Sequence, residues 1–449
     1  MSIIRMSFLP AILLAMPLLG AATFQIPVTY YKLPNGLRVV ISENHSTPVV
    51  AVSVYYRTGF RSEPKGQTGF AHLFEHMMFE GSENLSKADF SRLIEGNGGS
   101  FNGSTNFDFT NYYEIFPSNR VETALWMEAD RMRALKVTEE NLANQKEVVM
   151  EEVRVNVLNQ PYALFQWIDL WQHANQNWYN SHNGYGDFTD LRAATIPMAE
   201  EFYKTYYSPN NAVLAVVGDV ETEEVKKAVQ KYFVEIPQRA SPSKLDVTEP
   251  PQKEEKRIQQ KDKLANLPAI AIGYHVPPQN SPDYPAMSLL NAVLAGDQSS
   301  RMYQRLVKEK QICLDWAGSM NLFGSDFDYD GPMLLTMNGV YKEGFAAADL
   351  IREVDDLIAN VQKNGVTEKE LADAKTSFRS NFYELVSTPV GAAQLLAALA
   401  LFRDDPSSVN ALLDPYMKVQ TSQLQTVAAK YLVSSNRTII DRVPEKGGK

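Results

Sequence analysis

Hydrophobic and polar positions along the chain follow two different periods. Runs rich in β-branched and aromatic residues predict strands at Val49–Tyr56 and residues 212–217. Apolar residues at helical spacing predict helices at Lys87–Glu95, residues 121–135 and residues 350–362. Because both patterns occur in each half of the chain, we expect an α+β fold.

A proline-rich and charged stretch at residues 237–257 separates the two halves and predicts an exposed linker. The halves also resemble each other. Thr138 and Thr367 each stand as the expected N-cap of a helix with acidic residues in its first turn, at an offset of 367 minus 138, or 229. We therefore predict a duplication, with one domain at residues 23–236 and a homologous domain at residues 258–449.

The first 22 residues have the pattern of a signal peptide. Arg5 precedes an apolar run at residues 8–19, and small residues lead to an expected cleavage after Ala22. The alternative is a membrane anchor, but the run is shorter than the roughly 20 residues that a spanning helix needs, and Pro10 and Pro17 interrupt it. We expect a periplasmic or secreted bacterial protein without stable membrane insertion after cleavage.

Composition narrows the class of function. The 449 residues are 44% hydrophobic, which supplies more than one core of ordinary size. Lys and Arg total 43 against 53 for Asp and Glu, a net charge of -10, so no nucleic acid partner is expected.

The strongest local chemical signal is His72-Leu73-Phe74-Glu75-His76. On a helix, His72 and His76 project from one face about one turn apart and can bind one metal ion. Glu75 borders the same face, where it can activate a water molecule. Thr68 is the expected N-cap of this helix and Gly81 the residue that ends it.

The alternative is that these polar side chains are hydrogen-bonded in an ordinary core helix. The rest of the helix is almost wholly apolar, so its polar side chains would be buried and would need partners there. The apolar positions are Phe70, Leu73, Phe74, Met77, Met78 and Phe79. This environment favours the metal interpretation.

A catalytic zinc takes three protein ligands, so a third must come from elsewhere in the chain. On a helical wheel Glu152 falls between Val148 and Val149, on the apolar side, whereas Glu147 and Glu151 fall on the solvated side. A carboxylate on the apolar side would be buried without compensation unless it meets a cation. We therefore predict Glu152 as the third ligand of one Zn²⁺ per chain.

The H-x-x-E-H signature, followed by Glu152 at 76 residues after His76, resembles the pitrilysin-type (inverzincin) zinc peptidases, which include the mitochondrial processing peptidases and their bacterial relatives. The likeness also covers residues 33–37, 98–113 and 207–211. It implies two similar domains, each a mostly antiparallel sheet packed with helices, that form one half of a clam-like chamber. It also implies a zinc-dependent endopeptidase that hydrolyses peptides or small unfolded proteins, with Glu75 activating the water.

The resemblance further implies that Asn102, Gly103 and Thr105 bind an extended peptide substrate. The glycine-rich residues 98–105 are a poor core strand but suit an exposed edge, whose backbone can accept a peptide as an added strand. The alternative is a glycine-rich turn before a strand at residues 111–116.

The sequence departs from the family pattern at several positions. Gln145 stands where relatives often have a glutamate, and Asn381 occupies the second-half position equivalent to Glu152, so the second domain is expected to be inactive. Val307 and Leu314 align with an Arg and a Tyr that complete enzymes use at the substrate carbonyl. We therefore expect a homologous second subunit that supplies this pair; the alternative is a homodimer that uses other donors.

Two other functions stay open at this point. One is a catalytically inactive scaffold or assembly subunit whose zinc is structural and whose metal site is closed. The other is a metal hydrolase of a different ester or amide, for which an edge strand offers no rationale.

Overall fold

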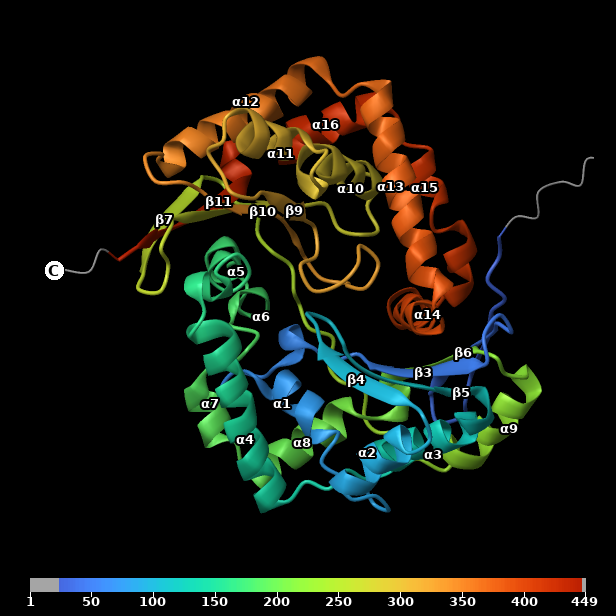
Figure 1. Cartoon of the computed structure of the whole chain (residues 1–449). Helices are drawn as coiled ribbons and strands as arrows, with labels where there is room; N and C mark the ends of the chain where they lie inside the picture. Colours follow the sequence, from blue (N-terminus) through green and yellow to red (C-terminus); the bar gives the residue numbers. More distant parts are fainter. Residues whose placement is uncertain (1–23, 446–449) are drawn as a thin grey trace, which may run out of the picture.

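Two sheets, one in each half of the chain, organise the fold (Figure 1). The computed structural model describes residues 24–445, so the predicted signal peptide at residues 1–22 lies outside the described residues. The six-stranded first sheet consists, in spatial order, of β1 (Thr29–Lys32), β2 (Arg38–Glu43), β6 (Ala212–Gly218), β3 (Val49–Tyr56), β5 (Thr110–Pro117) and β4 (Ser100–Thr105). The five-stranded second sheet consists of β7 (Lys256–Asp262), β11 (Arg437–Pro444), β8 (Ala269–His275), β10 (Leu334–Val340) and β9 (Ala317–Ser319).

The two sheets repeat one arrangement. Without β1, the order β2-β6-β3-β5-β4 matches β7-β11-β8-β10-β9. In each sheet the first of these pairs is parallel and the other three are antiparallel. The predicted α+β fold of two similar, mostly antiparallel units is confirmed.

Helices surround both sheets. Those of the first half are α1 (Phe70–Met77), α2 (Lys87–Glu95), α3 (Val121–Arg133), α4 (Glu139–Val153), α5 (Asp169–Ala174), α6 (Trp178–Ser181), α7 (Phe188–Ala193), α8 (Ile196–Tyr206) and α9 (Thr222–Phe233). Those of the second half are α10 (Tyr284–Asn291), α11 (Arg301–Tyr303), α12 (Ala347–Asn364), α13 (Glu368–Ser387), α14 (Pro389–Arg403), α15 (Asp414–Met417) and α16 (Thr421–Tyr431). The predicted strand at Val49–Tyr56 and helix at Lys87–Glu95 match β3 and α2.

The duplicated helix starts have the same N-terminal caps. The Thr138 hydroxyl accepts the N–H of Asn141 at the start of α4, and the Thr367 hydroxyl accepts the N–H of Glu370 at the start of α13. Each cap satisfies one of the N–H groups that the first turn leaves without a helical partner. The two helices therefore begin 229 residues apart, as the sequence predicts.

Each half lends one helix to the sheet of the other half. Helix α14, whose residues are apolar on nearly every side, packs on β3 and β6 of the first sheet, and α5 packs on β8 and β11 of the second (Figure 1). A helix buried from several directions needs apolar residues all round. Within residues 24–445 no single helix is long and apolar enough to cross a membrane. Helices α13 and α14 reach that length and apolar content only when they are taken together, and they are bent by 105° where they meet.

The segment between the two units has no regular structure over residues 237–255. Its end differs from the predicted linker, because Lys256 and Arg257 already belong to β7. The segment is also fixed to the first half, since the Glu249 carboxylate accepts the N–H of Asn177 at 3.0 Å and the side-chain amide of Asn180 at 2.7 Å.

Candidate metal centre

Helix α1 carries the two histidines and is fixed at its N-terminus by a buried carboxylate. The helix follows Gly69, whose φ of 85° suits glycine, and Glu63 accepts the N–H groups of Gly69 and Ala71 at 2.9 Å each. The predicted N-cap at Thr68 is wrong, because the Thr68 hydroxyl donates to Asp190 at 2.7 Å. The Glu63 side chain, six residues before Gly69, thus bonds the N–H groups that Thr68 was expected to cap.

His72, His76 and Glu152 converge on one point between α1 and α4. The Nε2 atoms of His72 and His76 lie 3.7 and 3.2 Å from the two carboxylate oxygens of Glu152, and one ligand atom from each residue lies within 4.8 Å of the others. Tetrahedral ligands about 2.0–2.1 Å from a zinc ion are separated by about 3.4 Å. The three side chains therefore fit one zinc ion with little adjustment.

The face of α4 that carries Glu152 is more open than the helical wheel predicts. The Glu152 side chain is 37% exposed and Val148 is 40% exposed, whereas both were expected on the buried side. Glu147 and Glu151 are exposed, as predicted. The helical wheel separates Glu152, which lies beside the two histidines, from the exposed Glu147 and Glu151, but it cannot show that this face of α4 borders open space instead of core.

The charges around the three side chains suit metal ligands. Burial, followed by the charge of His76, lowers the pKa of His72 to about 4, so this imidazole is neutral at pH 7. Burial also lowers the pKa of His76, but the hydrogen bond to Glu152 and the negative charges of Glu152 and Glu75 together outweigh burial, so the pKa is raised. The same hydrogen bond holds the pKa of Glu152 below its usual value, so Glu152 is a carboxylate.

Glu75 lies beside this group and against the edge strand β4. Burial raises its pKa, and the Thr105 hydroxyl donates to its Oε2 at 2.7 Å. A Cβ atom on Gly103 would lie 3.3 Å from Glu75 Cγ, so the glycine brings the strand close to the carboxylate. Asn102 is exposed, and its side-chain oxygen accepts the N–H of Gly103 at 2.9 Å. Of the three predicted peptide-binding residues, Gly103 and Thr105 thus reach Glu75 and Asn102 does not.

Gln145 lies on α4 near Glu152 but bonds a carboxylate outside the group of His72, His76 and Glu152. It is buried, and its amide nitrogen donates to Glu80 Oε1 at 2.8 Å; Lys87 is the ion-pair partner of the same carboxylate. Glu80 therefore supplies a negative charge behind the site that sequence reasoning did not assign. Its position four residues after His76 is the one sequence signal that could have indicated Glu80.

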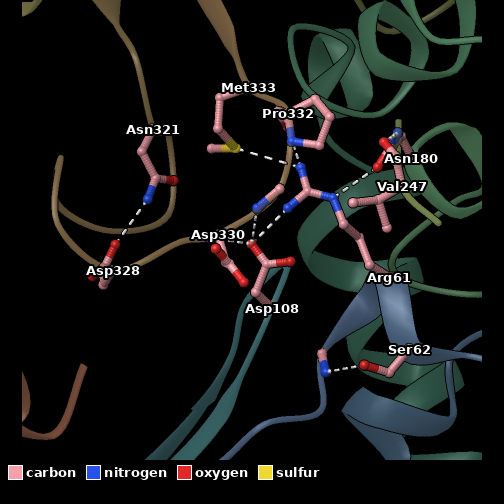
Figure 2. Close-up of polar contacts among 12 residues, drawn as sticks. Arg61, Ser62, Asp108, Asn180, Val247, Asn321, Asp328, Asp330, Pro332 and Met333 are labelled. Atoms are coloured by element: carbon pink, nitrogen blue, oxygen red, sulfur yellow. Dashed lines mark hydrogen bonds and ion pairs between the residues drawn. The ribbon is translucent and has the colours of Figure 1, made fainter. Parts of the chain in front are cut away.

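Arg61 joins the two halves next to the turn between β4 and β5 (Figure 2). Its guanidinium is 2% exposed and donates to Asp108 at 2.6 Å, to Asn180 at 2.9 Å and to the carbonyl of Pro332. The Asp108 carboxylate also accepts the N–H groups of residues 330–331 at 2.9 and 3.1 Å. Because Arg61 and Pro332 are 271 residues apart, no local pattern could have predicted this cluster.

Comparison with known proteins identifies the family. The family described as "Insulinase (Peptidase family M16)" matches residues 38–174, and "Peptidase M16 inactive domain" matches residues 194–378. The chain belongs to the M16 peptidase family. Within this M16 chain the first match contains His72, Glu75, His76 and Glu152.

Individual M16 relatives agree in sequence and fold. The zinc protease PqqE of Helicobacter pylori is 27% identical over 414 residues, which are 91% of each chain. A probable mitochondrial-processing peptidase subunit beta of Arabidopsis thaliana is 27% identical over 271 residues, 58% of this chain and 49% of that one. The crystal structure of a protease from Helicobacter pylori has a TM-score of 0.86 at 24% identity and covers 94% of this chain and 100% of that chain, which establishes the fold.

Proposed function

We propose that this chain is a zinc-dependent endopeptidase that hydrolyses peptides or small unfolded proteins. The observation that carries the proposal is the convergence of His72, His76 and Glu152 on one point, beside Glu75 and the free edge of β4. Homologues named zinc proteases support zinc as the metal. The proposal assigns one ion to each chain. In this proposal residues 23–236 carry the chemistry and residues 258–449 form the inactive domain.

A zinc ion bound by three protein side chains leaves one coordination position open, lowers the pKa of a water there to about 7 and polarises the scissile carbonyl. Glu75 precedes His76 on the same helix and has no ligand role in this geometry. Its carboxylate takes the proton of the attacking water and passes it to the leaving amine. The Thr105 hydroxyl fixes the orientation of that carboxylate through its hydrogen bond.

The free edge of β4 supplies the peptide site in this proposal. A strand at the end of a sheet has N–H and C=O groups on one side that no protein strand uses, and an extended peptide can pair with them. Gly103 has no side chain between this backbone and Glu75. Asn102, Gly103 and Thr105 are thus assigned to substrate binding, Gly103 through the strand backbone, Asn102 through its exposed side chain and Thr105 through Glu75.

A homologous second subunit completes the enzyme in this proposal. Val307 and Leu314 stand where an Arg and Tyr pair is expected, and neither can donate a hydrogen bond from its side chain. Leu314 is 52% exposed. One relative is itself named a subunit of a processing peptidase. A homodimer is the alternative, and size-exclusion chromatography with and without a co-expressed homologue separates the two.

The N-terminal sequence places the protein in the periplasm or outside the cell in this proposal. Arg5, the apolar run at residues 8–19 and the small residues before position 23 support a cleaved signal. Determination of the N-terminus of the mature protein tests this assignment, with a start at Thr23 as the expected result.

Glu75→Gln tests the proposed chemistry. The amide keeps the shape of the side chain but cannot accept the proton, so we expect about one zinc per chain and a loss of peptidase activity of about a hundredfold or more. Glu147→Gln, at an exposed position on α4, is the matched control and should retain full activity. Zinc is measured by atomic spectroscopy and activity with a library of quenched fluorescent peptides.

The outcomes separate the candidate functions. Turnover that survives in Glu75→Gln would require a different base or a different reaction. If the wild type binds zinc but cleaves no peptide, alone or with a homologous subunit, the scaffold function replaces the peptidase function.

A further inference from the structure

A cavity of about 350 Å³ lies on the side of β4 that faces away from Glu75. Its walls come from both halves of the chain. Ser104, Asn106 and Asn111 belong to the first half, and Asp328 and Gln394 to the second. The cavity is therefore formed only where the loop before β10 and helix α14 meet the first sheet.

The alternation of a β-strand separates this cavity from the zinc side. Gly103 and Thr105 face Glu75, so Ser104 between them faces the opposite side, where its hydroxyl donates to Asn111. A peptide paired with the free edge of β4 has the same alternation. Every second substrate side chain is thus directed to the side of the sheet on which this cavity lies.

The lining of the cavity suits a cation on an apolar stem. The described residues that line it include one carboxylate, Asp328, and no lysine, arginine or histidine. Oδ1 of Asn106 is buried without a hydrogen-bond partner among the described residues. Phe109, Phe323 and Leu385 provide apolar surface beside these oxygen atoms. Lysine and arginine side chains combine a methylene stem with a group that only donates hydrogen bonds.

The Asp328 carboxylate is held in place by its own loop. It accepts the side-chain amide of Asn321 at 2.9 Å and the N–H of Ser325 at 3.0 Å. A Cβ atom on Gly324 would lie 2.5 Å from Asp328 Oδ1, so a larger residue there would displace the carboxylate from its present position. Figure 2 shows Asp328 bonded to Asn321 and apart from the guanidinium of Arg61.

No cationic side chain within residues 24–445 pairs with this carboxylate, although Arg57 and Arg61 pair with acidic residues nearby. Burial raises the pKa of Asp328 to about 7. A bound cation would favour the charged form and would satisfy the group that the protein leaves without a counter-ion.

We propose that this cavity is a specificity pocket that binds a lysine or arginine side chain of the peptide paired with β4. The proposal rests on the proposed peptidase function and adds a substrate preference to it. Asp328 is the residue that determines the preference, through an ion pair with the substrate side chain. The pocket requires both halves of the chain, which gives the second half a direct role in substrate selection.

A position-scanned peptide series tests the pocket. One peptide sequence carries lysine, arginine, norleucine, glutamine or glutamate in turn at each position, and kcat/KM is measured with the zinc-loaded full chain. At one position we expect lysine or arginine to exceed norleucine by about tenfold or more. Asp328→Asn should remove this preference and leave kcat/KM for the norleucine peptide unchanged.

Two further variants keep the test decisive. Asp326→Asn is the matched control, because this carboxylate belongs to the same loop but bonds Ser288 and lines a different cavity; the preference should persist. Gln394→Glu adds a carboxylate to the pocket from α14 and should increase the preference for lysine or arginine. This variant tests the pocket if Asp328→Asn fails to fold. An unchanged preference in Asp328→Asn, or an equal loss for the norleucine peptide, would overturn the proposal.

Failure of the pocket and failure of the peptidase function give different results. Cleavage of the peptides without any charge preference contradicts the pocket alone. If no peptide is cleaved, binding of labelled peptides to the Glu75→Gln variant is measured by fluorescence anisotropy. The lysine peptide should bind about tenfold more tightly than the norleucine peptide. This difference should vanish in the double variant that also carries Asp328→Asn. Equal binding of both peptides contradicts the pocket in that case too.

Discussion

The free edges of the two sheets have equivalent backbones and different chemistry. Gly103 on β4 and Gly318 on β9 occupy the same step of their ladders. That step runs through Leu214, Val54, Tyr112 and Gly103 in the first sheet and through Ile439, Ile272, Met337 and Gly318 in the second. A Cβ atom on Gly103 would meet Cγ of Glu75 at 3.3 Å, and one on Gly318 would meet Oδ1 of Asn291 at 2.9 Å. Cβ of Ala295 lies nearer still, at 2.6 Å, so Asn291 and Ala295 together border the second glycine where Glu75 borders the first.

The second helix of each site differs in the same way. Glu152 on α4 and Asn381 on α13 are 229 residues apart, the offset of the two threonine caps. Asn381 borders a cavity of about 570 Å³, and none of the described residues that line it is a histidine. The second half therefore keeps the strand, the glycine and both helices without the metal ligands. The same scaffold thus forms in the second half without counterparts of His72, His76 and Glu152, so these side chains are not needed for the fold, which supports their proposed role as metal ligands.

Glu152→Ala gives the largest expected effect on this comparison. Two histidines alone are fewer than the three ligands of a catalytic zinc, so zinc affinity should fall by more than about a hundredfold and activity with it. Asn381→Ala, at the equivalent position of the second half, should change neither. Isothermal titration with zinc and a peptide assay measure both variants. Full zinc occupancy in Glu152→Ala would show that another group is the third ligand.

Asp108→Ala tests how strongly the second half supports the first. The change leaves the buried guanidinium of Arg61 without its carboxylate, so the free energy of unfolding should fall by about 3–5 kcal/mol. Glu200→Ala breaks the exposed pair with Lys204 and should cost less than about 1 kcal/mol. Urea unfolding of the three proteins measures the difference. A similar loss of unfolding free energy in both variants would show that the Arg61–Asp108 pair stabilises the protein no more than an exposed ion pair does.

The contribution of Asp108 should also depend on pH. Burial alone would raise the pKa of Asp108, but the Arg61 charge and the N–H groups of residues 330–331 hold it below its usual value. A carboxyl with a depressed pKa in the folded state contributes its full stability above its unfolded pKa of about 4, and the contribution is lost as the pH falls further. The difference in stability between wild type and Asp108→Asn should therefore shrink below about pH 4.

Thr105→Val gives a smaller effect that concerns the chemistry alone. The variant keeps the volume of the side chain but removes the hydrogen bond to Glu75, so kcat should fall by about tenfold while zinc content is unchanged. Thr105→Ser restores the hydroxyl and should recover most of the activity. If Thr105→Val loses zinc as well, the residue supports the metal site and not the orientation of Glu75.

The sequence predicts a residue of the site where the pattern of that residue's own segment is enough to orient its side chain. Helical spacing orients the two histidines and Glu75 on one helix and separates Glu152 from Glu147 and Glu151 on another, and the glycine content marks residues 98–105 as an edge strand. Glu63 bonds the start of α1 from only six and eight residues away, but across an irregular segment that no periodic pattern describes. Arg61 contacts Pro332, a residue that comes near it only in the folded protein. The same limit applies to the exposure of Val148, because a wheel describes one helix and not its neighbours.

The fold shows the same division between local and distant determinants. The strands and helices with clear periodicity have the predicted positions, and the threonine caps at positions 138 and 367 reveal the duplication. The exchange of α14 and α5 between the sheets could not be predicted. An apolar helix indicates only that its surface is covered, and the covering sheet lies in the other half of the sequence.

Asn381→Glu has the smallest expected effect, because it should leave the zinc content at one ion per chain. The change restores a carboxylate at the position equivalent to Glu152, yet α10 provides no histidine, and the nearest equivalent of Glu75 is the amide of Asn291. A single carboxylate and an amide do not form a catalytic zinc site. Atomic spectroscopy of the variant after dialysis with excess zinc gives the stoichiometry. A second bound ion would mean that the second half has metal ligands at positions other than those equivalent to His72 and His76. In that case the change at residue 381 alone would account for the missing metal binding of the second half.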